Sequence, residues 1–241
     1  MQFDPRTVAR EIPGVLDEVF PQLTPSVVAR FNNTASTVAV TPLADDLLRQ
    51  STVQRAILFE LGCVLGERFL KGASAVDWPD CIDETVERQR KYFDVELPIN
   101  LTLEDQVLAE TVGRNLAGVL GHITAIEGEP VVIGPRIPGL EWIASGQGDF
   151  SVGRTLIEVK CTSKRFSSAD YRQVAIYWLL SFAAAVEGRG AEWTELMLLN
   201  PRSGEKVCLK IDSLLAVISG GRTKVDILQL FQALVGSRLT R

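Results

Sequence analysis

Residues 148–160 decide the fold, and they read Gly148-Asp149-Phe150-Ser151-Val152-Gly153-Arg154-Thr155-Leu156-Ile157-Glu158-Val159-Lys160. This stretch predicts a β-hairpin, because Gly153-Arg154 suits a two-residue turn of the Gly-X type between apolar residues. Such a turn pairs Val152 with Thr155. Stepping outward then pairs Phe150 with Ile157, and Asp149 with Glu158.

This register predicts which side chains share a face of the hairpin. Side chains alternate along a strand, and residues directly opposite in an antiparallel pair share a face. Asp149, Glu158 and Lys160 are therefore expected to lie together. The other face is apolar and expected to be packed, with Phe150, Val152, Ile157 and Val159 on it.

Two carboxylates held opposite each other repel unless positive charge lies between them. A divalent metal ion together with Lys160 would supply that charge. The hairpin alone leaves a second interpretation open, in which an exposed polar face carries a chance salt bridge.

The composition is that of an ordinary globular protein. The chain has 241 residues, of which 46% are hydrophobic and 23% charged, enough for one large core or a core with a small appendage. No apolar run approaches the roughly 20 residues of a membrane span, and the N-terminus lacks the pattern of a signal peptide. We therefore expect a cytoplasmic protein without membrane association.

The cysteines and the histidine restrict the metal chemistry. Cys63, Cys81, Cys161 and Cys208 are scattered, with no CxxC pair, and are expected to be reduced, buried thiols. A zinc or iron–sulfur site is not expected. The single histidine, His122, excludes a site with several histidine ligands.

The net charge is −5, so the charge of the whole chain does not predict a strong electrostatic attraction to nucleic acid. Residues 154–172 nevertheless carry five basic residues against two acids. Among them Lys164, Arg165 and Arg172 are candidates for phosphate contacts, with ordinary surface solvation as the alternative. The acidic balance also suggests that nucleic acid reaches the protein through a partner protein or a homo-oligomer.

A helix is predicted over residues 51–71, and Glu60 interrupts its apolar stripe. A buried glutamate without a partner is costly, so Glu60 should meet a metal ion or a basic group, unless it reaches solvent at the edge of the stripe. Glu67, two turns later, is the substitute candidate. Gly62 and Gly66 would let another element approach the opposite side closely.

The other elements follow from periodicity and turn signals. Helices are predicted at 83–92, 103–120, 169–186, 212–218 and 223–234, strands at 130–134, 193–200 and 206–211, and loops at 136–142 and 161–166. On the helix over 169–186, Gln173 and Tyr177 are four residues apart and so share a face. Residues 1–50 predict short helical pieces interrupted by prolines. We treat them as an N-terminal cap segment with no assigned chemistry.

The order of helix, acidic hairpin, QxxxY helix and strand resembles the PD-(D/E)XK nuclease superfamily, and within it the RecB-like branch. The likeness covers about residues 51–211. Gly148 replaces the proline of the family's motif, and the cysteines that hold an iron–sulfur cluster in some relatives are missing. The matching residues are Asp149, Glu158-Val159-Lys160, Gln173 and Tyr177, with Glu60 at the place of the family's helix glutamate.

The resemblance implies an α/β (α+β) fold with a restriction-endonuclease-like core. That core is a mixed central β-sheet flanked by helices, with extra N-terminal and C-terminal helices. The nuclease-like domain would span residues 51–241, with its core over 51–211 and C-terminal helices over 212–241.

The resemblance also implies roles for the site residues. Asp149 and Glu158 would ligate one or two Mg²⁺ ions, with the Val159 carbonyl as a further ligand and Glu60 completing the shell. Mn²⁺ is expected to substitute, and no iron–sulfur cluster is expected. Lys160 would orient the attacking water or stabilise charge, with Gln173 and Tyr177 positioning the metal's water or the phosphate.

The favoured hypothesis is therefore a Mg²⁺-dependent nuclease that hydrolyses DNA, in restriction, phage defence or DNA repair. A second hypothesis is a non-catalytic nuclease-fold subunit that acts as a scaffold in a nucleic-acid-processing complex. The complete set of two acids and a lysine argues against it. A third, an RNA-directed nuclease, is not separated from the first by the sequence.

Overall fold

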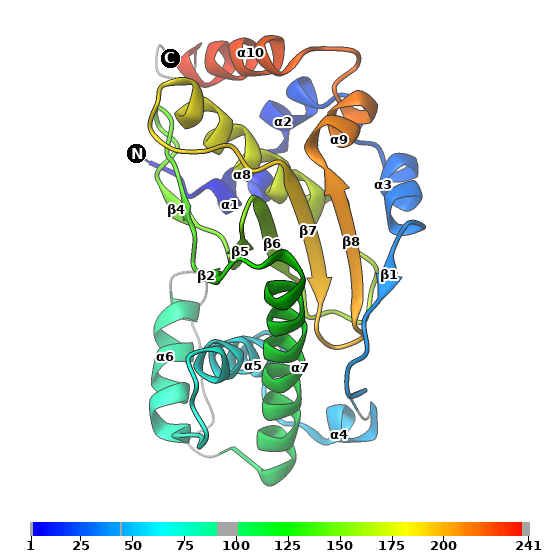
Figure 1. The fold of residues 1–241 in the computed structure, drawn as a ribbon, viewed down its shortest axis with the longest axis vertical. Coiled ribbons are helices and arrows are strands. Elements are labelled where there is room, and N and C mark those ends of the chain that lie inside the picture. The colour runs from blue at the N-terminus through cyan, green and yellow to red at the C-terminus, as the bar shows by residue number, and fades with distance from the viewer. Residues whose placement is uncertain (1, 44, 91–100, 238–241) are drawn as a thin grey trace.

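A computed structural model describes residues 2–43, 45–90 and 101–237 (Figure 1). Its centre is a six-stranded mixed sheet in the order β1-β8-β7-β6-β5-β2, with helices on both faces. The predicted α/β class with a mixed central sheet flanked by helices is confirmed. The strands are β1 (Ser36–Thr37), β2 (Val131–Ile133), β5 (Phe150–Val152), β6 (Thr155–Val159), β7 (Glu195–Asn200) and β8 (Glu205–Lys210).

The helices precede, interrupt and follow these strands along the chain. The first four, all within the N-terminal fifty residues, are α1 (Pro5–Glu11), α2 (Pro13–Val19), α3 (Pro25–Asn32) and α4 (Asp45–Gln50). The others are α5 (Arg55–Leu70), α6 (Trp78–Arg90), α7 (Leu103–Glu127), α8 (Ser168–Val186), α9 (Ile211–Ile218) and α10 (Lys224–Ser237).

The predicted hairpin forms from β5 and β6 in the predicted register. Phe150 lies opposite Ile157, and Val152 lies opposite Thr155. Gly153 has a φ of +53°, which the first residue of a Gly-X turn requires and which glycine adopts without strain. On its other side β6 pairs in parallel with β7, and α8 makes the crossover between these two strands.

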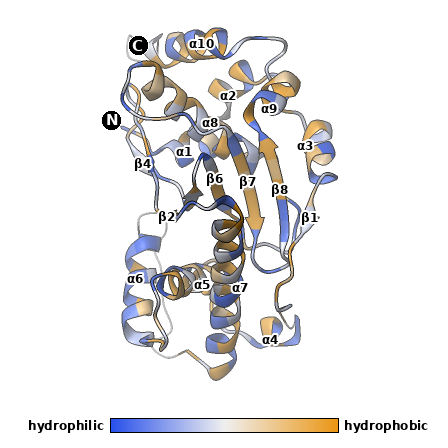
Figure 2. Ribbon diagram, in the orientation of Figure 1, coloured by the Kyte–Doolittle hydropathy of each residue, from blue (hydrophilic) through white to orange (hydrophobic). Residues whose placement is uncertain are grey.

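One face of the sheet packs against the C-terminal part of α7, which meets the sheet at β2 and β5 (Figure 1). The apolar face predicted for the hairpin lies here and is buried, as expected. Apolar side chains of α7 meet it in one continuous cluster, and much of α7 is coloured as hydrophobic in Figure 2. The cluster contains Phe150, Val152, Ile157, Val159, Leu116, Val119, Leu120 and Ile123.

The other face of the sheet is covered by α8 together with helices from both ends of the chain. Side chains of α1, α2 and α3 join those of α8, α9 and α10 in one hydrophobic cluster. The strand β1 pairs with β8 at the edge of the sheet. The helical pieces of residues 1–50 are separated at prolines, as expected. Pro13 and Pro25 each begin the next helix, because a missing amide costs nothing in a first turn, and Pro21 lies between α2 and α3.

Several boundaries differ from the predictions for physical reasons. Part of the expected loop over 136–142 forms β3 (Arg136–Ile137), which pairs with β4 (Gly146–Gln147). The helix predicted to end at residue 120 continues to Gly128, whose φ of +71° ends it. The helix predicted over 83–92 starts earlier, at Trp78, and residues 91–92 lie outside the described residues.

No helix within the described ranges is both long enough and apolar enough to cross a membrane.

Glycines set the distance between α5 and α7. A Cβ atom at Gly62 would lie 2.6 Å from Val112 Cγ1, and one at Gly113 would lie 2.8 Å from Leu65 Cβ and 3.0 Å from the Gly62 carbonyl oxygen. The close approach predicted for one side of α5 is confirmed, and its partner is α7. Any side chain on these glycines must push the two helices apart.

We expect Gly113→Ala to destabilise the protein by about 1–3 kcal/mol, the usual cost of overpacking a tight interface. The matched control is Gly118→Ala on the same helix, where an added Cβ meets nothing within 4 Å. It should be neutral or stabilising by about 0.5–1 kcal/mol, since alanine favours a helix over glycine. Chemical denaturation of both variants measures the difference. Equal stabilities would contradict the close packing.

Candidate active site

The candidate site lies between the end of β6 and the first turns of α8. Strand alternation turns Glu158 toward α8, where only 2% of it is exposed. A capping box fixes the start of that helix: the Ser167 hydroxyl accepts from the Asp170 amide, and the Asp170 carboxylate accepts from the Ser167 amide at 2.8 Å. The helix is thereby held with its Gln173 side chain facing the strand.

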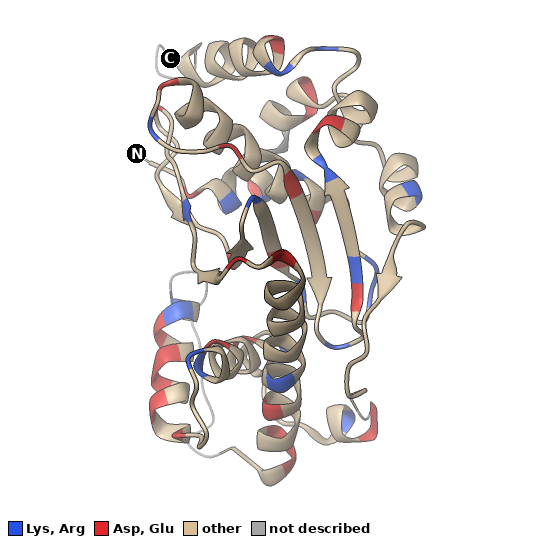
Figure 3. Cartoon of the chain, in the orientation of Figure 1, with Lys and Arg blue, Asp and Glu red and all other residues tan. Residues whose placement is uncertain are grey.

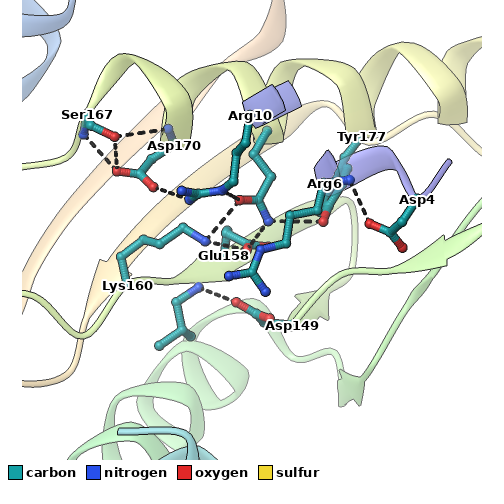
Figure 4. A network of polar contacts seen from close by, with 11 residues as sticks. Asp4, Arg6, Arg10, Asp149, Glu158, Lys160, Ser167, Asp170 and Tyr177 are labelled. Atoms are coloured by element: carbon teal, nitrogen blue, oxygen red, sulfur yellow. Dashed lines mark hydrogen bonds and ion pairs between the residues drawn. The ribbon is translucent and has the colours of Figure 1, made fainter. Parts of the chain in front are cut away.

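Four of the predicted residues meet in one hydrogen-bonded group (Figure 4). The Glu158 Oε1 atom accepts from Lys160 Nζ at 2.7 Å and from the Gln173 side-chain amide. Lys160 Nζ also donates to Gln173 Oε1 at 3.1 Å. Gln173 Nε2 lies 3.0 Å from the Tyr177 hydroxyl. The predicted pairing of Glu158 with Lys160 on one face, and of Gln173 with Tyr177 on one helix face, is confirmed.

Asp149 lies beside this group, directly before β5. Its Oδ2 atom accepts from the Val159 backbone amide at 2.7 Å, so the carboxylate closes the end of the hairpin. Burial raises the pKa of Asp149, while Lys160 and the Val159 amide oppose the rise. The charge of Asp149 in turn raises the pKa of Glu158, which shows that the two carboxyls interact.

Glu158 is the most perturbed acid of the site. Burial, followed by the charge of Asp149, raises its pKa to about 7, against the opposing influence of Lys160. Its second oxygen, Oε2, is buried and has no hydrogen-bond partner among the residues that the structure describes. An ionised carboxylate with a bare buried oxygen is costly, so this position favours either a proton or a bound cation.

Two arginines of α1 belong to the site, and the sequence analysis missed both. Arg10 donates from Nε to Gln173 Oε1 at 3.2 Å and from its terminal nitrogen to Asp170 at 2.7 Å. Arg6 lies next to the carboxylates in Figure 4, and its charge is among those that oppose the burial-driven rise in the pKa of Glu158. The available signal was local: Asp4 caps α1, and Arg6 and Arg10 are four residues apart on one face.

The two candidate helix carboxylates on α5 have different partners. Glu67 is 7% exposed and forms a two-point ion pair with Arg88 of α6, with N–O distances of 2.6 and 2.7 Å. Glu60 accepts from Gln89 at 3.0 Å and lies 3.6 Å from Arg88. The basic partner expected for Glu60 is therefore present. Burial is the main cause of the raised pKa of Asp149, and the charge of Glu60 raises it further.

The predicted phosphate-binding residues have mixed surroundings. Arg165 donates to the Asn33 side chain at 2.9 Å and to the Asn32 carbonyl at 2.6 Å, and Arg172 is paired with Asp17. Both thus fasten the N-terminal helices to the loop before α8 and to α8 itself. Lys164 is exposed on that loop.

The four cysteines are free thiols. Cys81 is buried and Cys63 and Cys161 are half-buried, but Cys208 is exposed, so the prediction that all four are buried is wrong for Cys208. It lies on β8 beside the short edge strand β1, which does not cover it. Within the described part of the chain, no three His, Cys, Asp or Glu side chains are grouped closely enough to hold a metal ion by themselves.

No protein-family model, curated protein or solved structure matches this chain.

The pKa of Glu158 gives a pH-dependent stability that can be measured without metal. Between its ordinary value of 4.5 and its folded value of about 7, the folded protein binds the Glu158 proton more tightly than the unfolded chain does. The contribution of Glu158 to the free energy of unfolding should therefore fall as pH rises through this window.

The test compares wild type with Glu158→Gln by denaturation in EDTA at a series of pH values. The free energy of unfolding of wild type should fall relative to that of the variant from about pH 4.5 to pH 7, then run parallel to it above pH 7. Parallel curves over the whole range would show that Glu158 does not titrate abnormally.

Proposed function

We propose that this protein is a Mg²⁺-dependent nuclease of the PD-(D/E)XK type that hydrolyses phosphodiester bonds in DNA. One observation carries the proposal: Lys160 and Gln173 hold one oxygen of the buried Glu158 carboxylate, and the other oxygen accepts no hydrogen bond from any described residue. Beside it lies a second buried carboxylate, that of Asp149. A cation is the ligand that such a pair accommodates best.

The arrangement of elements supports a restriction-endonuclease-like core. The acids come from the hairpin β5–β6, the crossover helix α8 faces them, and β7 returns in parallel beside β6. The helix α5, which carries Glu60, lies on the other side of the sheet with α7. The contact between Gln173 and Tyr177 supports the RecB-like assignment, because it links both residues of QxxxY to Glu158.

The donor set fits a hard cation. The carboxylates of Asp149 and Glu158 and the carbonyl of Val159 would hold the ion, with Glu60 reaching it through water. Mg²⁺ suits two carboxylates because it keeps several of its own waters, so a third convergent side chain is not required. When bound, Mg²⁺, or Mn²⁺ in its place, would polarise the scissile phosphate and lower the pKa of a coordinated water.

The other residues of the group have roles that follow from their contacts. The ammonium group of Lys160 donates to Glu158 at 2.7 Å, so it would orient the attacking water or stabilise negative charge developing on the phosphate. The Gln173 amide holds both Glu158 and Lys160, and Tyr177 and Arg10 hold Gln173 in turn. These three residues would keep the reacting groups in position.

One observation favours the alternative of a non-catalytic scaffold. Lys160 and Glu158 already form a closed ion pair, and within the described residues the acids do not form a three-ligand group. A nuclease fold that has lost its metal could keep such a pair for stability. Metal binding therefore separates the two functions.

The first test is cleavage of linear, circular and single-stranded DNA, and of RNA, in Mg²⁺ or Mn²⁺. We expect wild type to cleave, and Lys160→Ala and Asp149→Ala each to lose about 10²- to 10⁴-fold in rate, as removal of a positioned catalytic group does. Lys210→Ala, an exposed lysine at the far end of β8, is the matched control and should keep full activity. Equal activity of all four proteins would refute the enzymatic proposal.

The second test is Mn²⁺ binding to the isolated protein by calorimetry, which needs no substrate. Wild type should bind Mn²⁺, and at about a hundredfold excess over Kd the ion should add about 2.7 kcal/mol to the free energy of unfolding. Asp149→Ala and Glu158→Gln should each weaken binding at least about tenfold. The control Glu104→Gln removes an exposed acid of α7 and should have no effect. Absence of binding to wild type would support the scaffold instead.

A further inference from the structure

A cavity of about 590 Å³ opens where the helices α4 and α5 meet the loop after β6 and the β7–β8 turn. In Figure 1, α4 and this turn lie at the same end of the molecule. Its wall includes Arg49, Arg55, Phe59, Cys161, Ser163 and Arg202.

The cavity carries positive charge in an acidic protein. Three arginines line it against one acid, Asp45, which gives a local balance of +2 in a chain with a net charge of −5. Arg202 is paired with Asp45 at 3.0 Å. Arg49 and Arg55 are exposed, and neither forms an ion pair with any other described residue. Two guanidinium groups are thus available to an anionic ligand.

The cavity lies next to the loop that follows Lys160, the last residue of the candidate active site at the end of β6. Cys161, in its wall, directly follows Lys160 in the chain. The Asn200 side chain donates to the Thr162 carbonyl at 2.7 Å, which ties the loop after Lys160 to the turn that carries Arg202.

The size and the chemistry of the wall indicate the ligand. A volume of this order matches a pocket for a small molecule, and so one or two nucleotides of a single strand, whereas a duplex does not enter it. Guanidinium groups pair well with phosphate oxygens. The ring of Phe59 offers a face on which a base can stack, and grooves for single strands combine these two features.

We infer that this cavity binds a single strand of nucleic acid through Arg49, Arg55 and Arg202, with a base against Phe59, and holds that strand next to the loop that follows Lys160. The inference deepens the proposed nuclease function and rests on it. It makes single-stranded nucleic acid, or the frayed end of a duplex, the substrate class. It also replaces Arg165 and Arg172, which are engaged in contacts with the N-terminal helices, as the phosphate-binding residues.

The test is fluorescence anisotropy in EDTA, so that binding is measured without cleavage. The probes are a labelled oligothymidylate of about 15 nucleotides, its duplex with oligoadenylate, and oligouridylate of the same length. Wild type should bind the single strands more tightly than the duplex. Arg49→Ala/Arg55→Ala should lose at least about tenfold in affinity and lower the salt slope by about 1.4, since each phosphate contact on a single strand contributes about 0.7.

Two further variants make the result specific. Arg30→Ala/Lys210→Ala removes the same amount of charge from exposed positions on α3 and at the end of β8, and should change affinity little. Asp45→Asn should tighten binding several-fold, because it removes the acid of the cavity and frees Arg202. Both arginines of the double variant are exposed, so its melting temperature should match that of wild type.

The inference is overturned if wild type prefers the duplex, if no single strand binds, or if both double variants lose affinity equally. Tighter binding of oligouridylate than of oligothymidylate would keep the cavity as a single-strand site and assign it RNA. A strand that binds here but is not cleaved in Mn²⁺ refutes the nuclease and leaves the binding site standing. Lys160-dependent cleavage with unchanged binding by Arg49→Ala/Arg55→Ala refutes the binding site alone.

Discussion

The buried carboxylate of Glu158 is the constraint on which the rest of the site depends. Removing it from water raises its pKa to about 7, so its charge is stable only with compensating groups around it. Lys160 and Gln173 donate hydrogen bonds to one carboxylate oxygen, and the other oxygen accepts none from the described residues. Glu158, Lys160 and Gln173 are held at one point by the register of the hairpin, the capping of α8 and the packing of α1. The unsatisfied oxygen of Glu158 is the strongest argument for a bound cation.

The helices α1, α2 and α3 pack against α8 and the loop before it and so support this site. Arg10 links α1 to Gln173 and Asp170, and Arg172 links α8 to Asp17 of α2. The side chain of Asn32 at the end of α3 donates to the Phe166 carbonyl at 2.8 Å and accepts from the Tyr171 hydroxyl. Arg165 and Arg172, which the sequence offers as phosphate contacts, are thus engaged in contacts that hold the fold together. Arg49 and Arg55 are exposed and are more available to a phosphate group than these two arginines.

The second carboxylate-rich region, on α5 and α6, is organised differently. The guanidinium group of Arg88 forms ion pairs with Glu67 and Glu84 and, at a longer distance, with Glu60. A buried acid with such a bidentate partner is satisfied, so Glu67 has little capacity left for a metal ion. Glu60 keeps the looser contacts and lies within electrostatic influence of Asp149. This difference is the physical basis for preferring Glu60 over Glu67 as the helix carboxylate.

The sequence by itself determined the hairpin, its register, its buried apolar face and the shared face of Gln173 and Tyr177. These features depend on neighbours within about ten residues, where turn chemistry and the periods of strand and helix are decisive. Only the tertiary structure decided which charges meet across the fold. Arg10 and Gln173 are 163 residues apart, Glu67 and Arg88 are 21 apart, and Arg165 and Asn33 are 132 apart. No local pattern encodes such pairs, because packing of whole helices, and not spacing in the chain, brings them together.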